Sequence, residues 1–232
     1  MRQMTFVSPF QSPFVNPFPS QVSAAASWWL SGGIAAANCV AAYAPKGAAS
    51  LAASYSNLAN PGTYDAAPGA APDWDVTNGW KFNGSSHHLT TGIVQSSTAF
   101  SVICRFNNVT SGAWLFGHGK ASNNSRFAIA PKLSNKIYYC LDGSGSTWII
   151  VNTLITSGVL AIAGTKAYRD GVQETGTMTP VLDDTYGFFI GAINSNGSAT
   201  SRIAAYVQAI SFYDVTLTST QIGALTTAIN LL

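Results

Sequence analysis

The stretch 79–92 contains the pattern that most restricts the fold of this chain. Trp80 and Phe82 alternate with Lys81, so an extended segment would have one aromatic face and one charged face, as a half-buried strand requires. Asn83-Gly84 follows, and both residues tolerate the positive φ of a tight turn. Alternation then resumes. We therefore expect two strands of a sandwich within these residues.

Short alternating runs of the same kind continue toward the C-terminus, separated by Gly and Asn. They are 100–106, 114–116, 126–130, 136–141, 148–152, 159–163, 166–169, 188–190 and 203–213, and residues 39–43 form an earlier one. Asp170-Gly171 between two runs is a strong hairpin signal, whereas Gly117-His118-Gly119 is expected to be a turn. Many short strands with such turns are typical of an all-β antiparallel sandwich.

Two segments have helical spacing instead. Residues 48–58 are rich in Ala, with apolar residues at i, i+4 and i+7, before a loop rich in Pro and Gly that extends to Trp74. Residues 218–229 begin with the capping-box pair Thr218 and Gln221, followed by apolar residues at helical intervals. We expect a short helix near each segment.

Residues 1–22 differ from the rest and are predicted to form an extended arm preceding one domain, 23–232. A Pro-Phe pair recurs at every fourth residue, which blocks helix formation: Pro9, Phe10, Pro13, Phe14, Pro17 and Phe18. Exposed Phe side chains cost about 1.5–3 kcal/mol each relative to burial, so we expect this arm to dock on a partner. The alternative is a low-complexity tail.

Charge is sparse in this chain of 232 residues: 9% of residues are charged and the net charge is +2. The cations are scattered singly, which excludes the basic stripe of a nucleic-acid binder. Such low charge is typical of a protein held in an assembly, here expected to be a homo-oligomer, although an uncharged polar surface would give the same composition. Residues 22–45 carry no charge but are too polar to span a membrane.

Three cysteines, Cys39, Cys104 and Cys140, are widely separated and lie in apolar runs. Their odd number and spacing predict buried thiols and assembly in a reducing compartment.

The order of the motifs resembles the concanavalin A-like, laminin-G-like jelly-roll superfamily. The matching segments, within residues 38–230, are Phe82-Asn83-Gly84, 100–106, Tyr168-Arg169-Asp170-Gly171, Ile190-Gly191, and 210–213 followed by Leu217-Thr218. The resemblance implies an antiparallel jelly-roll β-sandwich. The region 28–74 is similar to versions found in phage-encoded proteins.

Catalytic groups of the expected kinds are scarce. The superfamily includes glucanases that use two glutamates and an aspartate on one strand, but this chain has one glutamate, Glu174. The adjacent carboxylates of Asp183-Asp184 would point to opposite faces of a strand, and so would the rings of His87-His88. We therefore predict no enzymatic activity, with a polysaccharide hydrolase as a remote alternative.

Motifs for ligand binding are also few. Asp73-x-Asp75-x-Thr77 has alternating oxygen ligands but lacks the glycine and glutamate of an EF-hand loop, so no metal or cofactor is predicted, and calcium in another loop is a minor alternative. The candidates for stacking on a sugar are Trp114, Tyr138, Tyr139 and Trp148. Aromatic residues in strands are more often core, which is the competing interpretation.

These observations lead to a virion structural protein as the main functional hypothesis: a capsid decoration or minor capsid protein, assembled in the host cytoplasm and attached to other virion proteins by its N-terminal arm. The alternative is a tail or fibre adhesin that binds host surface carbohydrate.

Overall fold

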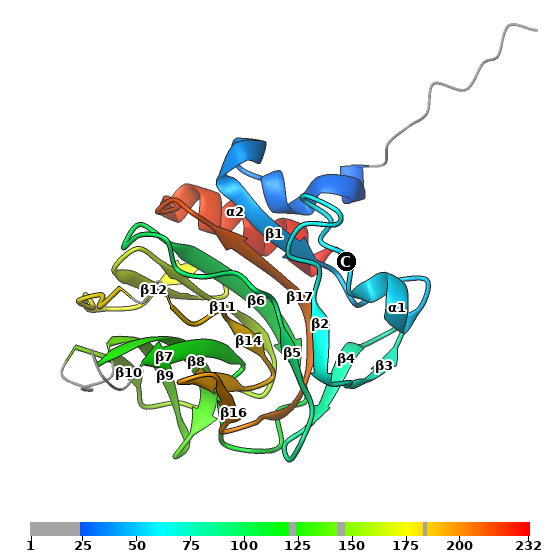
Figure 1. Cartoon of the computed structure of the whole chain (residues 1–232). Coiled ribbons are helices and arrows are strands. Elements are labelled where there is room, and N and C mark those ends of the chain that lie inside the picture. Colours follow the sequence, from blue (N-terminus) through cyan, green and yellow to red (C-terminus); the bar gives the residue numbers. More distant parts are fainter. Residues whose placement is uncertain (1–23, 121–123, 143–146, 183–184) are drawn as a thin grey trace, which may run out of the picture.

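The computed structural model describes residues 24–120, 124–142, 147–182 and 185–232. In this part of the chain two β-sheets pack face to face, which confirms the predicted all-β sandwich (Figure 1). The predicted arm, 1–22, lies outside the described residues, so its docking role stays a prediction.

The first sheet contains β1 (Cys39–Tyr43), β3 (Asp73–Asp75), β4 (Gly79–Asn83), β6 (Ser101–Asn107), β11 (Gly158–Ala163), β12 (Lys166–Arg169), β13 (Val172–Gln173) and β17 (Ala204–Tyr213). Its order is β13-β12-β11-β6-β17-β4-β3, and β1 also pairs with β17. The predicted hairpin is present: Arg169 pairs with Val172, and Asp170 and Gly171 both have positive φ.

The second sheet contains β2 (Ala67–Ala70), β5 (His88–Thr90), β7 (Phe116–Lys120), β8 (Ser125–Leu133), β9 (Lys136–Asp142), β10 (Ile149–Val151), β14 (Phe189–Ile190), β15 (Ile193–Ser195) and β16 (Ser198–Thr200). Its main order is β10-β9-β8-β7-β14-β5-β2. The β15–β16 hairpin joins β7 through a parallel pairing.

The stretch 79–92 supplies one strand to each sheet. Strand β4 pairs with β17 in the first sheet, whereas β5 pairs with β14 in the second. Trp80 and Phe82 are buried and Lys81 is exposed, as alternation predicts. The turn at Gly84 (φ +76°) therefore lies in the connection between the two layers of the sandwich.

The main core fills the space between the sheets. Its largest fully buried side chains include Trp80, Tyr43, Tyr139, Phe116 and Phe127. The outer face of the first sheet is covered by the 3₁₀ helix η1 (Ala24–Leu30) and the helix α2 (Ser219–Asn230), which lie beside β1 and β17 in Figure 1. A short 3₁₀ turn, η2 (Ala36–Asn38), leads into β1. The outer face of the second sheet is therefore the one that these helices leave uncovered.

Both predicted helices are present, although one is short. In α2 the Thr218 hydroxyl accepts from Gln221 N, and the Gln221 side chain accepts from Thr218 N, which completes the capping box. The other helix, α1 (Leu51–Ser54), has a single turn. It ends there because the buried Asn57 side chain accepts a hydrogen bond from Ala42 N and donates one to Val40 O. These two bonds to β1 hold the chain in a non-helical conformation.

Two segments differ from expectation. The predicted loop before Trp74 contains β2 at a sheet end, where its Pro68 is tolerated. Residues 117–119 form part of β7 and not a turn. A Cβ on Gly117 would lie 2.6 Å from Ala128 Cβ, so the glycine allows β7 to approach β8 closely.

Among the helices of the described residues, none combines the length and the apolar character needed to cross a membrane.

Candidate functional site

Three of the four predicted aromatic residues meet on the outer face of the second sheet. The Trp114 and Trp148 rings are 6.1 Å apart and the Tyr138 and Trp148 rings 5.9 Å apart, with an interplanar angle of 85° in both pairs. Trp114 is buried, whereas Tyr138 and Trp148 are half-buried. These three residues, with Arg126, are called the aromatic–arginine cluster below.

Tyr139, the fourth candidate, lies on the opposite face of β9. Its ring is fully buried between the sheets, and its hydroxyl donates to Tyr168 O at 3.1 Å. Neighbouring residues of a strand point to opposite faces, so Tyr138 and Tyr139 could not both face solvent. Tyr139 is therefore left out of the site.

Small side chains form the floor beneath the cluster. Ala128 and Ala130 of β8 and Cys140 of β9 are fully buried there, and they pack with Trp114 and Ile193. Because these side chains extend little from the sheet, the indole rings can lie close to its surface. The alternating sequence of β8 places Phe127 and Ile129 in the main core, on the other side.

Arg126 is a part of the site that sequence reasoning missed. Its guanidinium carbon lies over both indoles, 5.4 Å from the centroid of Trp114 and 5.5 Å from that of Trp148. Among the described residues, its Nε is buried and has no hydrogen-bond partner. Alternation along β8 does predict that Arg126 lies on the same outer face as Ala128 and Ala130. Its contact with two tryptophans from distant segments cannot be inferred from neighbouring residues.

A hydrogen bond that Trp148 donates to the end of β9 orients its ring. Its Nε1 donates to Asp142 O at 2.7 Å, and the Asp142 carboxylate accepts from the Thr147 hydroxyl. Asp142 itself is buried. This bond restricts rotation of the ring, so that the half-buried indole presents a defined surface.

A cavity of about 190 Å³ adjoins the cluster. Its lining comes from β7, β8 and β15 and from the residue before β8: Gly119, Lys120, Asn124, Ser125, Arg126, Ile193 and Ser195. These residues contribute two cations, amide and hydroxyl groups, and no carboxylate. Lys120 Nζ donates to the Thr185 hydroxyl at 3.0 Å. Arg126 belongs to both the cluster and the cavity, so the two form one continuous site.

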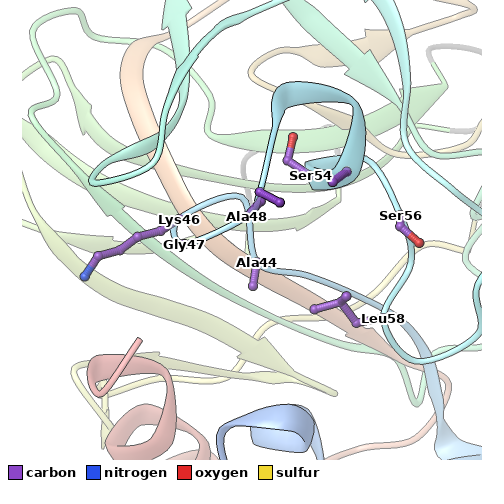
Figure 2. Close-up of a pocket in the computed structure, with 9 residues that line it drawn as sticks. Ala44, Lys46, Gly47, Ala48, Ser54, Ser56 and Leu58 are labelled. Carbon is purple, nitrogen blue, oxygen red and sulfur yellow. The ribbon is translucent and has the colours of Figure 1, made fainter.

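Two other cavities have different linings. One of about 320 Å³ is formed by residues 44–58, mostly Ala, Gly and Ser, and Figure 2 shows that its Lys46 side chain extends away from the other labelled side chains. Lys46 Nζ donates instead to Leu232 O. The other, about 330 Å³, lies against β4 and β17 and includes Lys81 and Tyr206. Neither lining includes Arg126 or another residue of the aromatic–arginine cluster.

The remaining reactive side chains do not line the cavity, although Cys140 lies in the floor of the cluster. Cys39, Cys104 and Cys140 are free and buried, and burial raises the pKa of Cys39 to about 12. His118 is fully buried, 4.4 Å from the Phe188 ring centroid. In the Asp73-x-Asp75-x-Thr77 motif, Asp75 Oδ1 accepts a hydrogen bond from Asn78 N at 2.7 Å, so Asp75 caps a turn. Within the described part of the chain, no three His, Cys, Asp or Glu residues gather around a point where a metal could bind.

Comparison with protein-family models gives no match, and no curated protein matches either. Solved structures do share the fold. A mutant of Trypanosoma rangeli sialidase displaying trans-sialidase activity aligns with 84% of this chain, with a TM-score of 0.60 and 18% identity. T. rangeli sialidase in complex with sialic acid aligns over the same share, with a TM-score of 0.59 and 16% identity. The alignments cover 34% and 33% of those proteins, so this chain corresponds to about a third of their length.

These comparisons correct two predictions made from sequence, that the chain is a virion structural protein and that it is not an enzyme. Both of these solved structures are sialidases, which are glycosidases, and nothing in the comparisons supports a virion or capsid protein. The two predictions depend on the N-terminal arm, the low charge and the scarcity of catalytic groups, and none of these features excludes a glycosidase-related fold. At this level of identity the comparison establishes the sandwich fold itself.

Proposed function

We propose that this chain is a carbohydrate-recognition domain whose binding site is the aromatic–arginine cluster with its adjoining cavity. The observation that carries the proposal is the pair of half-buried rings, Tyr138 and Trp148, next to Arg126, which also lines a polar cavity. The C–H faces of a sugar pack on aromatic rings, while its hydroxyls need the hydrogen-bonding groups that line the cavity.

The order of the sequence motifs supports the finer assignment to the concanavalin A-like jelly-roll superfamily, with an adhesin-like role on surface glycans. The sialidase comparison supports sugar recognition from an independent direction, since one of those proteins is in complex with sialic acid. Because this chain spans a third of such proteins, a binding domain within a larger carbohydrate-active protein fits both observations.

The test is a glycan array with the full chain, followed by calorimetric titration of the glycans that bind. Trp148→Ala and Tyr138→Ala should each weaken binding about tenfold or more, which corresponds to ~1.4 kcal/mol of lost packing. The matched control is Tyr206→Ala, a half-buried aromatic of the first sheet beside a different cavity. If no glycan binds, or if only the control weakens binding, the proposed site is wrong.

Sugar hydrolysis is a second candidate, favoured by the sialidase likeness alone. The same mixtures should be assayed for free sialic acid released from sialyllactose. Release by the purified chain would assign catalysis to this domain, and release that persists in Trp148→Ala would place the reacting groups outside the cluster.

A further inference from the structure

The cavity beside the aromatic–arginine cluster has an unbalanced charge. Lys120 and Arg126 both line it, and none of the described lining residues is a carboxylate. Arg126 forms no ion pair within the described residues, and the neighbouring Asp142 carboxylate, which accepts from the Thr147 hydroxyl, does not belong to the cavity lining. The described lining of the cavity therefore carries two cations and no carboxylate, so a ligand there would meet a net positive potential from these residues.

The guanidinium N–H groups of Arg126 are suitable hydrogen-bond donors to a ligand carboxylate. The two indoles are nearly perpendicular, so the planar guanidinium can lie flat against only one of them, and its N–H groups lie in its own plane. The buried Nε has no partner among the described residues, and burying a donor without a partner is unfavourable. A carboxylate accepts two parallel N–H bonds from such a group, which is the strongest neutralisation available to it.

We infer that the site selects acidic sugars, and that the carboxylate of the sugar binds in the cavity to Arg126, with Lys120 as the second cation. This inference rests on the proposed function. The sugar ring then packs on the exposed parts of Trp148 and Tyr138, and the hydroxyls of Ser125 and Ser195 lie in the same cavity lining. The class comprises sialic and uronic acids, whose shared feature is a carboxylate on a pyranose ring.

The experiment compares each acid with its own neutral ester. The full chain is titrated with 3′-sialyllactose, its methyl ester and lactose, and with a disaccharide ending in glucuronic acid and its methyl ester. Sialyllactose or the glucuronide should bind about 10- to 100-fold more tightly than its ester, the range expected for charged hydrogen bonds. The acid whose affinity exceeds that of its ester by the larger factor shows whether the site prefers a sialic or a uronic acid. Salt at about 1 M should weaken binding of the acid and leave lactose unaffected.

Variants then locate the effect. Arg126→Gln and Lys120→Gln should each reduce the ratio of acid to ester affinity, and Lys120 serves as the second test because its substitution leaves the packing of the indoles intact. Lys81→Gln, a cation on the exposed side of β4, should leave the ratio unchanged. Equal affinity for acids and esters, with Trp148→Ala still weakening both, would overturn the charge inference and keep the proposed function. Absence of binding to any sugar would overturn both.

Discussion

Gly191 lies directly against the ring of Phe82, so closely that a Cβ on Gly191 would come within 2.1 Å of Phe82 Cδ1. Both residues belong to short motifs that carry the sequence resemblance, and the fold brings them together in the core. The contact requires a residue without a side chain, and the φ of +82° at Gly191 requires the same.

Gly191→Ala should therefore lower the free energy of unfolding by roughly 3–5 kcal/mol, combining overpacking with backbone strain. Gly33→Ala is the matched control, because Gly33 has a φ of +74° and nothing within 4 Å of its added Cβ, so only strain of about 1 kcal/mol remains. Urea unfolding measures both. Equal losses in the two variants would show that the contact with Phe82 does not restrict this position.

Asn57→Asp should destabilise the fold strongly although it conserves shape. The Asn57 amide donates to Val40 O and Thr63 O, and its oxygen accepts from Ala42 N, all in a fully buried position. A carboxylate cannot donate, so we expect a loss of about 3 kcal/mol or more near neutral pH. Urea unfolding at about pH 7 and pH 4 should show a smaller loss at the lower pH, where the acid is more protonated.

Thr218→Ala should cost about 1 kcal/mol by removing the cap of α2. Thr227→Ala is the control, because Thr227 lies on the exposed side of the same helix and alanine has the higher helix propensity. Thermal unfolding followed by circular dichroism compares the two. A larger effect at Thr227 would contradict the capping role.

Stability should decrease as the pH rises above about 9. Burial raises the pKa of Cys39 to about 12 and also raises the pKa of Cys104 and of Tyr43 and Tyr139. In the unfolded chain these groups lose protons near pH 9 to 10, while in the folded chain they retain them. A rise in pH therefore stabilises the unfolded state relative to the folded state. Each group contributes up to about 1.4 kcal/mol per pH unit. Urea midpoints measured at intervals from about pH 8 to 11 test this, and Cys39→Ala should show a shallower decrease.

Trp114→Ala and Trp148→Ala should differ in stability although their rings touch. Trp114 is buried, so its removal should cost about 3–5 kcal/mol. Trp148 is half-buried, and about 1–2 kcal/mol is expected from the smaller area lost. Urea unfolding of both variants makes this comparison. Similar costs would indicate that Trp148 is a core residue with no surface for a sugar.

Short-range sequence patterns were enough to predict several local elements of this protein. Alternation identified strands such as β1 and β6, the Asp170-Gly171 pair identified a hairpin, and Thr218 with Gln221 identified the start of a helix. These features depend on side chains and backbone dihedral angles within a few residues, so they can be inferred without knowing what lies across the molecule.

The way in which these elements combine depends on contacts across the fold. The tertiary structure assigned β4 and β5 to different sheets, placed residues 117–119 in a strand against β8, and ended α1 through contacts of Asn57 with β1. It also brought Arg126 into contact with both Trp114 and Trp148. Each of these outcomes depends on contacts between segments distant in sequence, and the alternation of a strand specifies that it has two faces but not which neighbour covers each one.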